Sequence, residues 1–151
     1  MVVEAAGNGA ENLEDEIYQN KFNRSHRDSG AILVGAGAPP PGTYGRDYGP
    51  DRSRLEFSNY GAIVDVQGWE REVTTTGDAD LQGGVNEEDW YKDNFSGTSS
   101  ASPIIVGTLA CLQGILKSRG HLPLKPMHAR DVLRIPVLLS KMHPQDLAHR
   151  G

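Results

Sequence analysis

Short apolar runs, separated by glycine and proline, are the main pattern along this chain. Residues 2–6 form one run, which ends at a Gly-Asn-Gly turn, and residues 31–36 form a second, which ends before three prolines. Continuous apolar runs of this length are typical of buried parallel strands. Two further β-rich segments, 62–66 and 72–76, are each followed by turn residues and predict short strands.

One long helix is predicted to begin at Thr98 or Ser99 and to end at Gly120. Its apolar residues cover most of the helix circumference, which predicts a buried helix rather than a surface one. These residues are Ile104, Ile105, Val106, Leu109, Ala110, Leu112, Ile115 and Leu116. Cys111 lies among them and is therefore expected to be a small buried residue rather than a reactive thiol.

The remaining segments complete an alternation of strands and helices. Residues 11–18 have only a weak apolar stripe and predict a loop or a short helix, and residues 41–54 read as a surface loop. A second, shorter helix is predicted over 126–134, and no firm structure is assigned to 135–151. The pattern indicates an α/β domain with a parallel sheet and long loops.

Length and composition limit the function classes. The 151 residues make one domain at most, and 37% hydrophobic residues are enough for one core. The net charge of −5 provides no basic field for a phosphate backbone, so nucleic acid is not expected as a partner. No apolar run approaches the roughly 20 residues of a membrane span, so none is expected. The single cysteine provides neither an internal disulfide nor a zinc cluster.

The segment 95–103, a run of small residues that opens directly into the long helix, carries the strongest chemical signal. A serine hydroxyl at a helix N-terminus lies near free backbone N–H groups and the positive end of the helix dipole, which suits acyl transfer. An ordinary helix N-cap is the alternative, because serine and threonine are common there. An esterase of the nucleophile-elbow type is disfavoured, since Ala101 stands where that motif requires glycine.

The sequence Gly-Thr-Ser-Ser-Ala-Ser-Pro at 97–103 resembles the nucleophile motif of the subtilisin-like serine peptidases, of bacterial type. Upstream, Ala-Ala-Gly-Asn-Gly at 5–9 is similar to a second signature of that family, in the right order. The resemblance covers roughly residues 2–120 and corresponds to the C-terminal half of the catalytic domain. It implies a three-layer subtilisin-like α/β fold with a parallel sheet, truncated at its N-terminal side. Residues 1–134 would be that part of the domain, and 135–151 a tail of uncertain structure.

The resemblance also implies roles for two residues. Ser99 would be the nucleophile that forms an acyl-enzyme with a polypeptide substrate. Asn8 would donate its side-chain N–H to the oxyanion, together with the backbone N–H of Ser99. Taken alone, an asparagine between two glycines would more often be a turn residue.

The aspartate and histidine motifs that precede the serine in this family are absent. His26 is the only histidine before Ser99 and is expected to be a solvated surface residue. Without a base the serine is an ordinary alcohol, so the chain is expected to be inactive alone and to need the missing N-terminal half as a partner. The alternative is a non-catalytic pseudo-peptidase or gene remnant.

No cofactor and no metal ligands are identified. Family members often bind calcium, which is the sole reason to consider it here, because no calcium-ligand pattern is recognisable. The acidic residues around 87–89 are expected to form a solvated loop. Secretion is usual in the family, but the chain shows no signal-peptide pattern, so its localisation is unknown.

Overall fold

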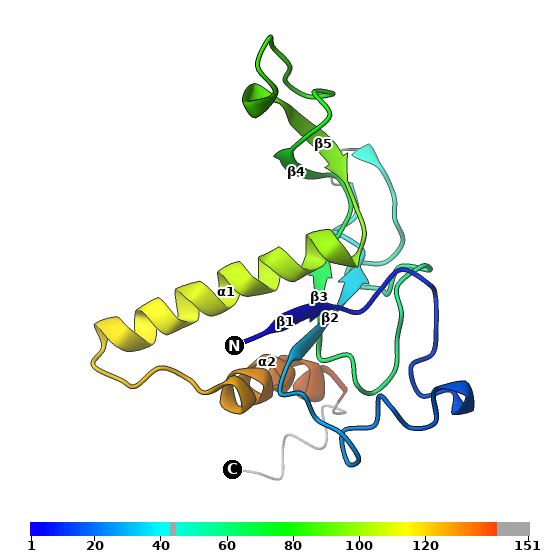
Figure 1. Ribbon diagram of the computed structural model, residues 1–151, viewed down its shortest axis with the longest axis vertical. Helices are drawn as coiled ribbons and strands as arrows, with labels where there is room; N and C mark the ends of the chain where they lie inside the picture. The colour runs from blue at the N-terminus through cyan, green and yellow to red at the C-terminus, as the bar shows by residue number, and fades with distance from the viewer. Residues whose placement is uncertain (43–44, 142–151) are drawn as a thin grey trace.

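A parallel sheet of three strands forms the centre of the computed structural model, which describes residues 1–42 and 45–141, with 136–141 described by their backbone alone. The strands are β1 (Val3–Ala5), β2 (Ile32–Gly37) and β3 (Val66–Trp69), in the order β1-β2-β3. Val34 of β2 pairs with Ala5 on one side and with Val66 on the other. Both apolar runs form parallel strands as predicted, and the parallel sheet confirms the predicted α/β fold (Figure 1). Only β2 is buried, however, because β1 lies at the edge of the sheet with its residues half-buried or exposed.

The third strand begins later than its sequence predicts. The segment 62–66 was expected to be β-structure, but β3 starts only at Val66 because Asp65 is committed to other contacts. Its buried carboxylate accepts two hydrogen bonds from Arg24, at 2.7 and 2.6 Å, and one from the Leu33 backbone N–H at 2.9 Å. A buried charge is stable only with such partners.

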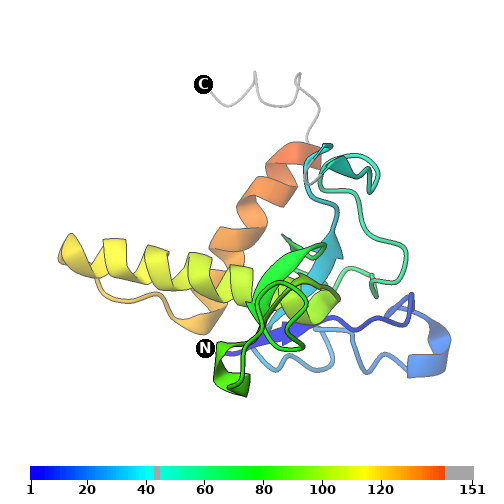
Figure 2. The ribbon, with the colours of Figure 1, turned by 90° about the horizontal axis from the view of Figure 1, so that it is seen from above.

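Two helices pack on one face of the sheet. They are α1 (Thr98–Ser118) and α2 (Pro126–Lys141), and both contribute to a core cluster with the strands (Figures 1 and 2). This cluster consists of Ile32, Val34, Val66, Ala101, Ile105, Leu109 and Ala129. Gly68 allows the closest approach of sheet and helix, since a Cβ there would lie 2.5 Å from the Ala101 carbonyl oxygen.

The bounds predicted for α1 are confirmed, but its predicted burial is wrong. Both ribbon views show its C-terminal part extending away from the sheet (Figures 1 and 2). Its buried apolar side chains are consequently those of the N-terminal half, while Val106 and Ile115 are about half exposed. Cys111 is also exposed, contrary to expectation, because it lies on the face turned away from the sheet.

By length and composition α1 could cross a membrane. Its 21 residues contain one charged side chain, Lys117. Core helices of globular domains meet the same criteria. Here the first half of α1 packs on all three strands, as a core helix does.

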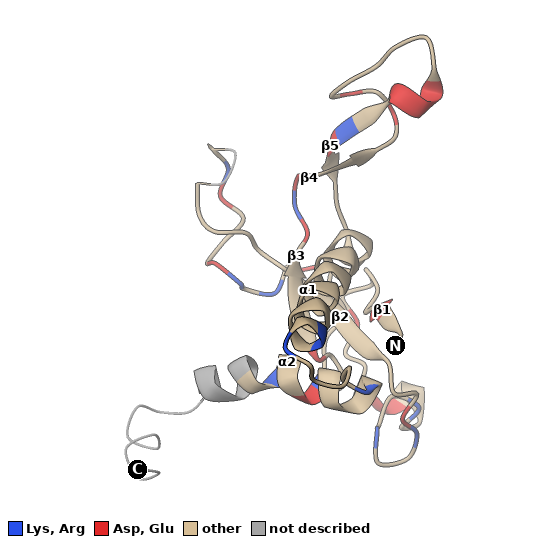
Figure 3. Ribbon diagram, turned by 90° about the vertical axis from the view of Figure 1, so that its left-hand side faces the viewer, with Lys and Arg blue, Asp and Glu red and all other residues tan. Residues whose placement is uncertain are grey.

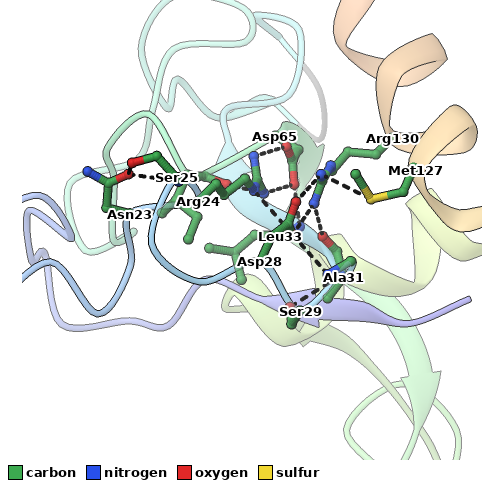
Figure 4. A network of polar contacts seen from close by, with 12 residues as sticks. Asn23, Arg24, Ser25, Asp28, Ser29, Ala31, Leu33, Asp65, Met127 and Arg130 are labelled. Atoms are coloured by element: carbon green, nitrogen blue, oxygen red, sulfur yellow. Dashed lines mark hydrogen bonds and ion pairs between the residues drawn. The ribbon is translucent and has the colours of Figure 1, made fainter.

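The second helix is longer than predicted. It was expected to end at Arg134, but α2 continues through Pro136 to Lys141, so part of the supposed tail is helical. Residues 142–151 lie outside the described residues. The buried Arg130 fixes α2 to the loop before β2 by donating to both carboxylate oxygens of Asp28, at 2.8 and 2.6 Å (Figure 4).

A second, two-stranded sheet stands apart from the first as an arm (Figure 1). The antiparallel strands β4 (Val73–Thr76) and β5 (Tyr91–Phe95) form its base, and only β4 was predicted. The 3-10 helix η3 (Glu87–Asp89) lies at its far end, where acidic residues gather (Figure 3). Another 3-10 helix, η1 (Glu16–Tyr18), confirms the loop or short helix expected over 11–18.

Candidate active site

The two segments singled out in the sequence meet at one edge of the parallel sheet. Asn8 follows the carboxyl end of β1, and Ser99 lies in the first turn of α1. Glu70 follows the carboxyl end of β3 and reaches the same turn. In open α/β sheets this edge is where ligands and reacting groups are usually bound.

The Asn8 side chain caps the N-terminus of α1, although Asn8 lies far from that helix in the sequence. Gly97, the N-cap residue, makes no side-chain capping bond, and the Asn8 side-chain oxygen takes that role. It accepts hydrogen bonds from the backbone N and the Oγ1 of Thr98, both at 2.9 Å. Among the described residues the Asn8 side-chain nitrogen has no hydrogen-bond partner. The carbonyl edge of the amide is therefore occupied and its N–H edge is available.

Two glycines make this approach possible. Gly97 has a φ of 105°, and a Cβ there would lie 3.1 Å from the Asn8 side-chain nitrogen. Gly7 has a φ of 99°, and its N–H donates to the Thr98 hydroxyl at 3.1 Å. Positive φ angles of this kind favour glycine. A larger residue at either position would strain the backbone and disturb the contact between Asn8 and Thr98.

Asn59 secures the loop that carries Asn8. Its side-chain oxygen accepts from the backbone N–H groups of Gly9 and Glu11, at 3.0 and 2.9 Å, and its side-chain nitrogen donates to the Ala6 carbonyl at 2.9 Å. The bridging role of Asn59 was not predicted from the sequence. Three such bonds restrict the Asn8 loop from a segment about 50 positions away.

Ser99 differs from the other serines in the first turn of α1. The Ser100 hydroxyl is buried and donates to the carbonyl oxygens of Gly97 and Glu70, and the Ser102 hydroxyl donates to the Thr98 carbonyl. Ser99 is exposed, and its hydroxyl makes no hydrogen bond within the described part of the chain. Its backbone N–H lies in the first turn of a helix, where N–H groups lack intrahelical acceptors.

Glu70 was missed in the sequence, where it stands among charged residues that read as a solvated turn. Its side chain is fully buried, and its carboxylate accepts a hydrogen bond from the Gly97 backbone N–H. The same carboxylate forms an ion pair with Arg71 at 3.0 Å. Burial raises the pKa of Glu70, while the Gly97 N–H and the Arg71 charge act in the opposite direction.

No base reaches Ser99 among the residues described. His26 is exposed, as expected, and the absence of any hydrogen bond to the Ser99 hydroxyl means that no described histidine contacts it. His143 and His149 lie outside the described residues. Within residues 1–42 and 45–141 no group of three or more His, Cys, Asp or Glu side chains could hold a metal ion.

Comparison with known proteins gives one match in sequence. A stretch of 70 residues is 40% identical to Subtilisin-like protease 6 of Trichophyton schoenleinii. The match covers 46% of this chain and 15% of that protein. No family model matches the chain.

Solved structures give broader matches in fold. The self-cleaved protease domain of PatA has a TM-score of 0.53 at 23% identity over 93% of this chain, and a cold-adapted subtilisin-like serine proteinase 0.51 at 23% over 86%. A lanthipeptide protease has a TM-score of 0.58 at 18% identity over 87% of this chain. The matches cover 41%, 36% and 41% of those three chains, respectively. The solved structures show that the chain has a subtilisin-like fold, and a 70-residue stretch of it is similar in sequence to a subtilisin-like protease.

Proposed function

We propose that the chain provides the nucleophile and the oxyanion-hole donors of a subtilisin-like serine endopeptidase that hydrolyses polypeptides. The observation that carries the proposal concerns Ser99, which is exposed and makes no side-chain hydrogen bond with any described residue, beside serines whose hydroxyls are hydrogen-bonded. A hydroxyl that makes no internal hydrogen bond is free to give its proton to a base and to attack a carbonyl carbon.

Asn8 and the backbone N–H of Ser99 would stabilise the tetrahedral intermediate. As the Ser99 oxygen adds to the substrate carbonyl, the carbonyl oxygen gains nearly a full negative charge. The Asn8 carboxamide is already held by Thr98 through its oxygen, so its N–H edge requires no reorganisation to meet that charge. The N-terminus of α1 adds favourable potential at the same point.

The proton of Ser99 must go to a base from outside the described residues. We infer that the base and its orienting carboxylate come from a polypeptide segment that carries the aspartate and histidine motifs, and that this chain is inactive alone. The alternative is a non-catalytic pseudo-peptidase. Failure of such a segment to assemble with the chain would favour that alternative.

Labelling with a fluorophosphonate probe tests the proposal, because the probe forms a covalent bond only with an activated serine. The chain is assembled with an N-terminal subtilisin-like segment that carries both motifs, and the labelled peptide is mapped by mass spectrometry. We expect label on Ser99, none in the Ser99→Ala variant, and full labelling in the matched Ser96→Ala variant.

Three outcomes would contradict this assignment in different ways. Label on Ser96, Ser100 or Ser102 would show that the nucleophile is misassigned. Serine-dependent peptide hydrolysis by the chain alone would disprove the need for an external base. Assembly without any labelling would favour the pseudo-peptidase.

A further inference from the structure

Glu70 is a buried acidic group for which the proposed reaction has no use. It is one of the largest side chains with no exposed surface, and it stands directly after β3. A buried carboxylate costs free energy unless it is paired and hydrogen-bonded. Its retention at the edge of the sheet that holds Ser99 therefore calls for a role in the local structure.

The contacts of Glu70 hold the Ser99 turn at both ends. On one side of Ser99, the Glu70 carboxylate accepts a hydrogen bond from the Gly97 backbone N–H. On the other side, the Ser100 hydroxyl donates to the Glu70 carbonyl oxygen at 3.0 Å. One residue thus holds the turn before and after the nucleophile.

Arg71 keeps the Glu70 side chain in place. Its guanidinium lies 3.0 Å from the Glu70 carboxylate and also packs over the rings of Tyr48 and Phe57, at 5.4 and 5.1 Å from their centroids. On its outer side it pairs with Glu56 at 3.3 Å, whose side chain is 79% exposed. Packed rings on one side and a second carboxylate on the other restrict the rotamers of Arg71.

We propose that Glu70 is a positioning residue, whose buried carboxylate sets the backbone of Gly97 and thereby the orientation of the Ser99 hydroxyl and N–H. This inference rests on the proposed function of Ser99. The groups that face the carboxylate are the Gly97 N–H on the helix side and Arg71 on its own segment, with Glu56 behind Arg71. The first turn of α1 contributes no acidic residue.

Protonation of Glu70 would weaken its bond to Gly97, because a neutral carboxyl accepts a hydrogen bond less strongly than a carboxylate. The first test measures this weakening in the unsubstituted chain. In ¹⁵N-labelled protein, the amide resonance of Gly97 is followed between neutral and acidic pH. We expect it to shift with a midpoint above the ordinary glutamate value, because burial raises the pKa of Glu70.

Matched variants assign that titration. In Glu70→Gln the shift of Gly97 should disappear, while in Glu56→Gln, which removes an exposed partner of the same arginine, it should persist. A Gly97 amide that does not titrate, or that titrates equally in Glu70→Gln, would overturn the proposal. If Glu70→Gln does not fold, a Gly97 amide that does not titrate in the unsubstituted chain still overturns the proposal.

The second test measures Ser99 itself in the assembled enzyme. Misplacement of a reacting group by a fraction of an ångström lowers its rate strongly, so Glu70→Gln should reduce fluorophosphonate labelling roughly ten- to hundredfold. Glu56→Gln should label at the normal rate. A changed Gly97 resonance with unchanged labelling would overturn the positioning role. If Ser99 labels in no form, the proposed function fails, and the Gly97 titration still decides whether Glu70 sets the turn.

Discussion

The Asn8 side-chain oxygen accepts two hydrogen bonds from Thr98, a residue 90 positions further along the chain. Both are 2.9 Å long, one from the backbone N–H and one from the hydroxyl. They connect the loop after β1 directly to the first turn of α1. The same two bonds decide which edge of the Asn8 amide remains available for a ligand.

Replacement of Asn8 separates its role as an oxyanion donor from its role as a cap of α1. In the assembled enzyme, Asn8→Leu should lower kcat with little change in KM, because the lost bond strengthens only as the oxyanion forms. The magnitude is the one known for an oxyanion-hole amide in a subtilisin, about a hundred- to a thousandfold. Peptide-amide hydrolysis by both forms measures the effect, and the isolated chain should show no difference between them.

A second variant controls for loss of the helix cap. Asn8→Asp retains an oxygen that can accept from Thr98 but has no N–H to donate, so it should keep the thermal stability and still lose turnover. Asn86→Leu, at an exposed asparagine on the arm, should leave turnover unchanged. Equal hydrolysis by wild type and both Asn8 variants would remove Asn8 from the site.

The contact between Gly68 and Ala101 predicts that alanine at position 68 and alanine at position 107 change the free energy of unfolding in opposite directions. In Gly68→Ala the new Cβ would meet the Ala101 carbonyl at 2.5 Å, so sheet and helix must separate. We expect the free energy of unfolding to fall by about 1–3 kcal/mol. In Gly107→Ala the new Cβ meets nothing within 4 Å, and the better helix propensity should raise that free energy by up to about 1 kcal/mol. Urea denaturation measures both, and a reversed order would contradict the packing.

The Asp28–Arg130 pair predicts how stability changes in acid (Figure 4). Hydrogen bonds from Arg130, and then from the Gly30 backbone N–H, lower the pKa of Asp28 below its ordinary 3.8. The unfolded chain therefore binds more protons than the folded chain in the acid range. The stabilisation is complete above the ordinary value and is lost as the pH falls through it toward the lower folded value.

Two substitutions test this effect by denaturation at a series of pH values. Asp28→Asn should be less stable than wild type at neutral pH, by about 1–3 kcal/mol, because Arg130 loses its charged acceptor. The difference should shrink as the pH falls below 4. Asp51→Asn, which alters a surface pair with Arg52, should follow the wild-type curve. A constant difference at all pH values would contradict the role of the Asp28 charge.

The uncovered apolar surface predicts that the isolated chain associates. Val106 and Ile115 are 49% and 50% exposed on α1, and β1 lies at an edge of its sheet. Sedimentation velocity should detect oligomers or aggregates, and Val106→Lys with Ile115→Lys should shift the population toward monomer. Val85→Lys, at an almost fully exposed position of the arm, should not. A sharp monomer peak with a cooperative melt from the unsubstituted chain would contradict this prediction.

Local sequence was sufficient to predict the elements whose own residues determine them. The runs at β1 and β2 are bounded by glycine, and α1 begins at a serine-rich turn and ends just before Gly120, so each carries its own signal. The strand β5 carries none, because Tyr-Lys-Asp-Asn-Phe has neither alternation nor β-branched residues. Its conformation depends on pairing with β4, which is a tertiary contact.

Burial was harder to predict than secondary structure. The apolar residues of α1 are as numerous as those of a buried helix, but which of them are covered depends on how far the sheet extends beside it. Glu70 presents the opposite case, because its side chain is fully buried although nothing in the sequence around this glutamate predicts burial. Asn8 and Ser99 were found through motif resemblance, whereas the links that hold them, through Thr98 and Glu70, required the fold.

The hydrogen bond between Glu70 and Gly97, two residues separated by 27 positions, closes the base of the arm. An insertion whose two ends are joined in this way behaves as a separate module. Beyond that hydrogen bond, changes in the length or sequence of the arm have only a small effect on the entropy of loop closure and leave the Ser99 turn in place. The far end of the arm could therefore diversify, or accept an inserted peptide, without rebuilding the edge of the sheet that carries Ser99.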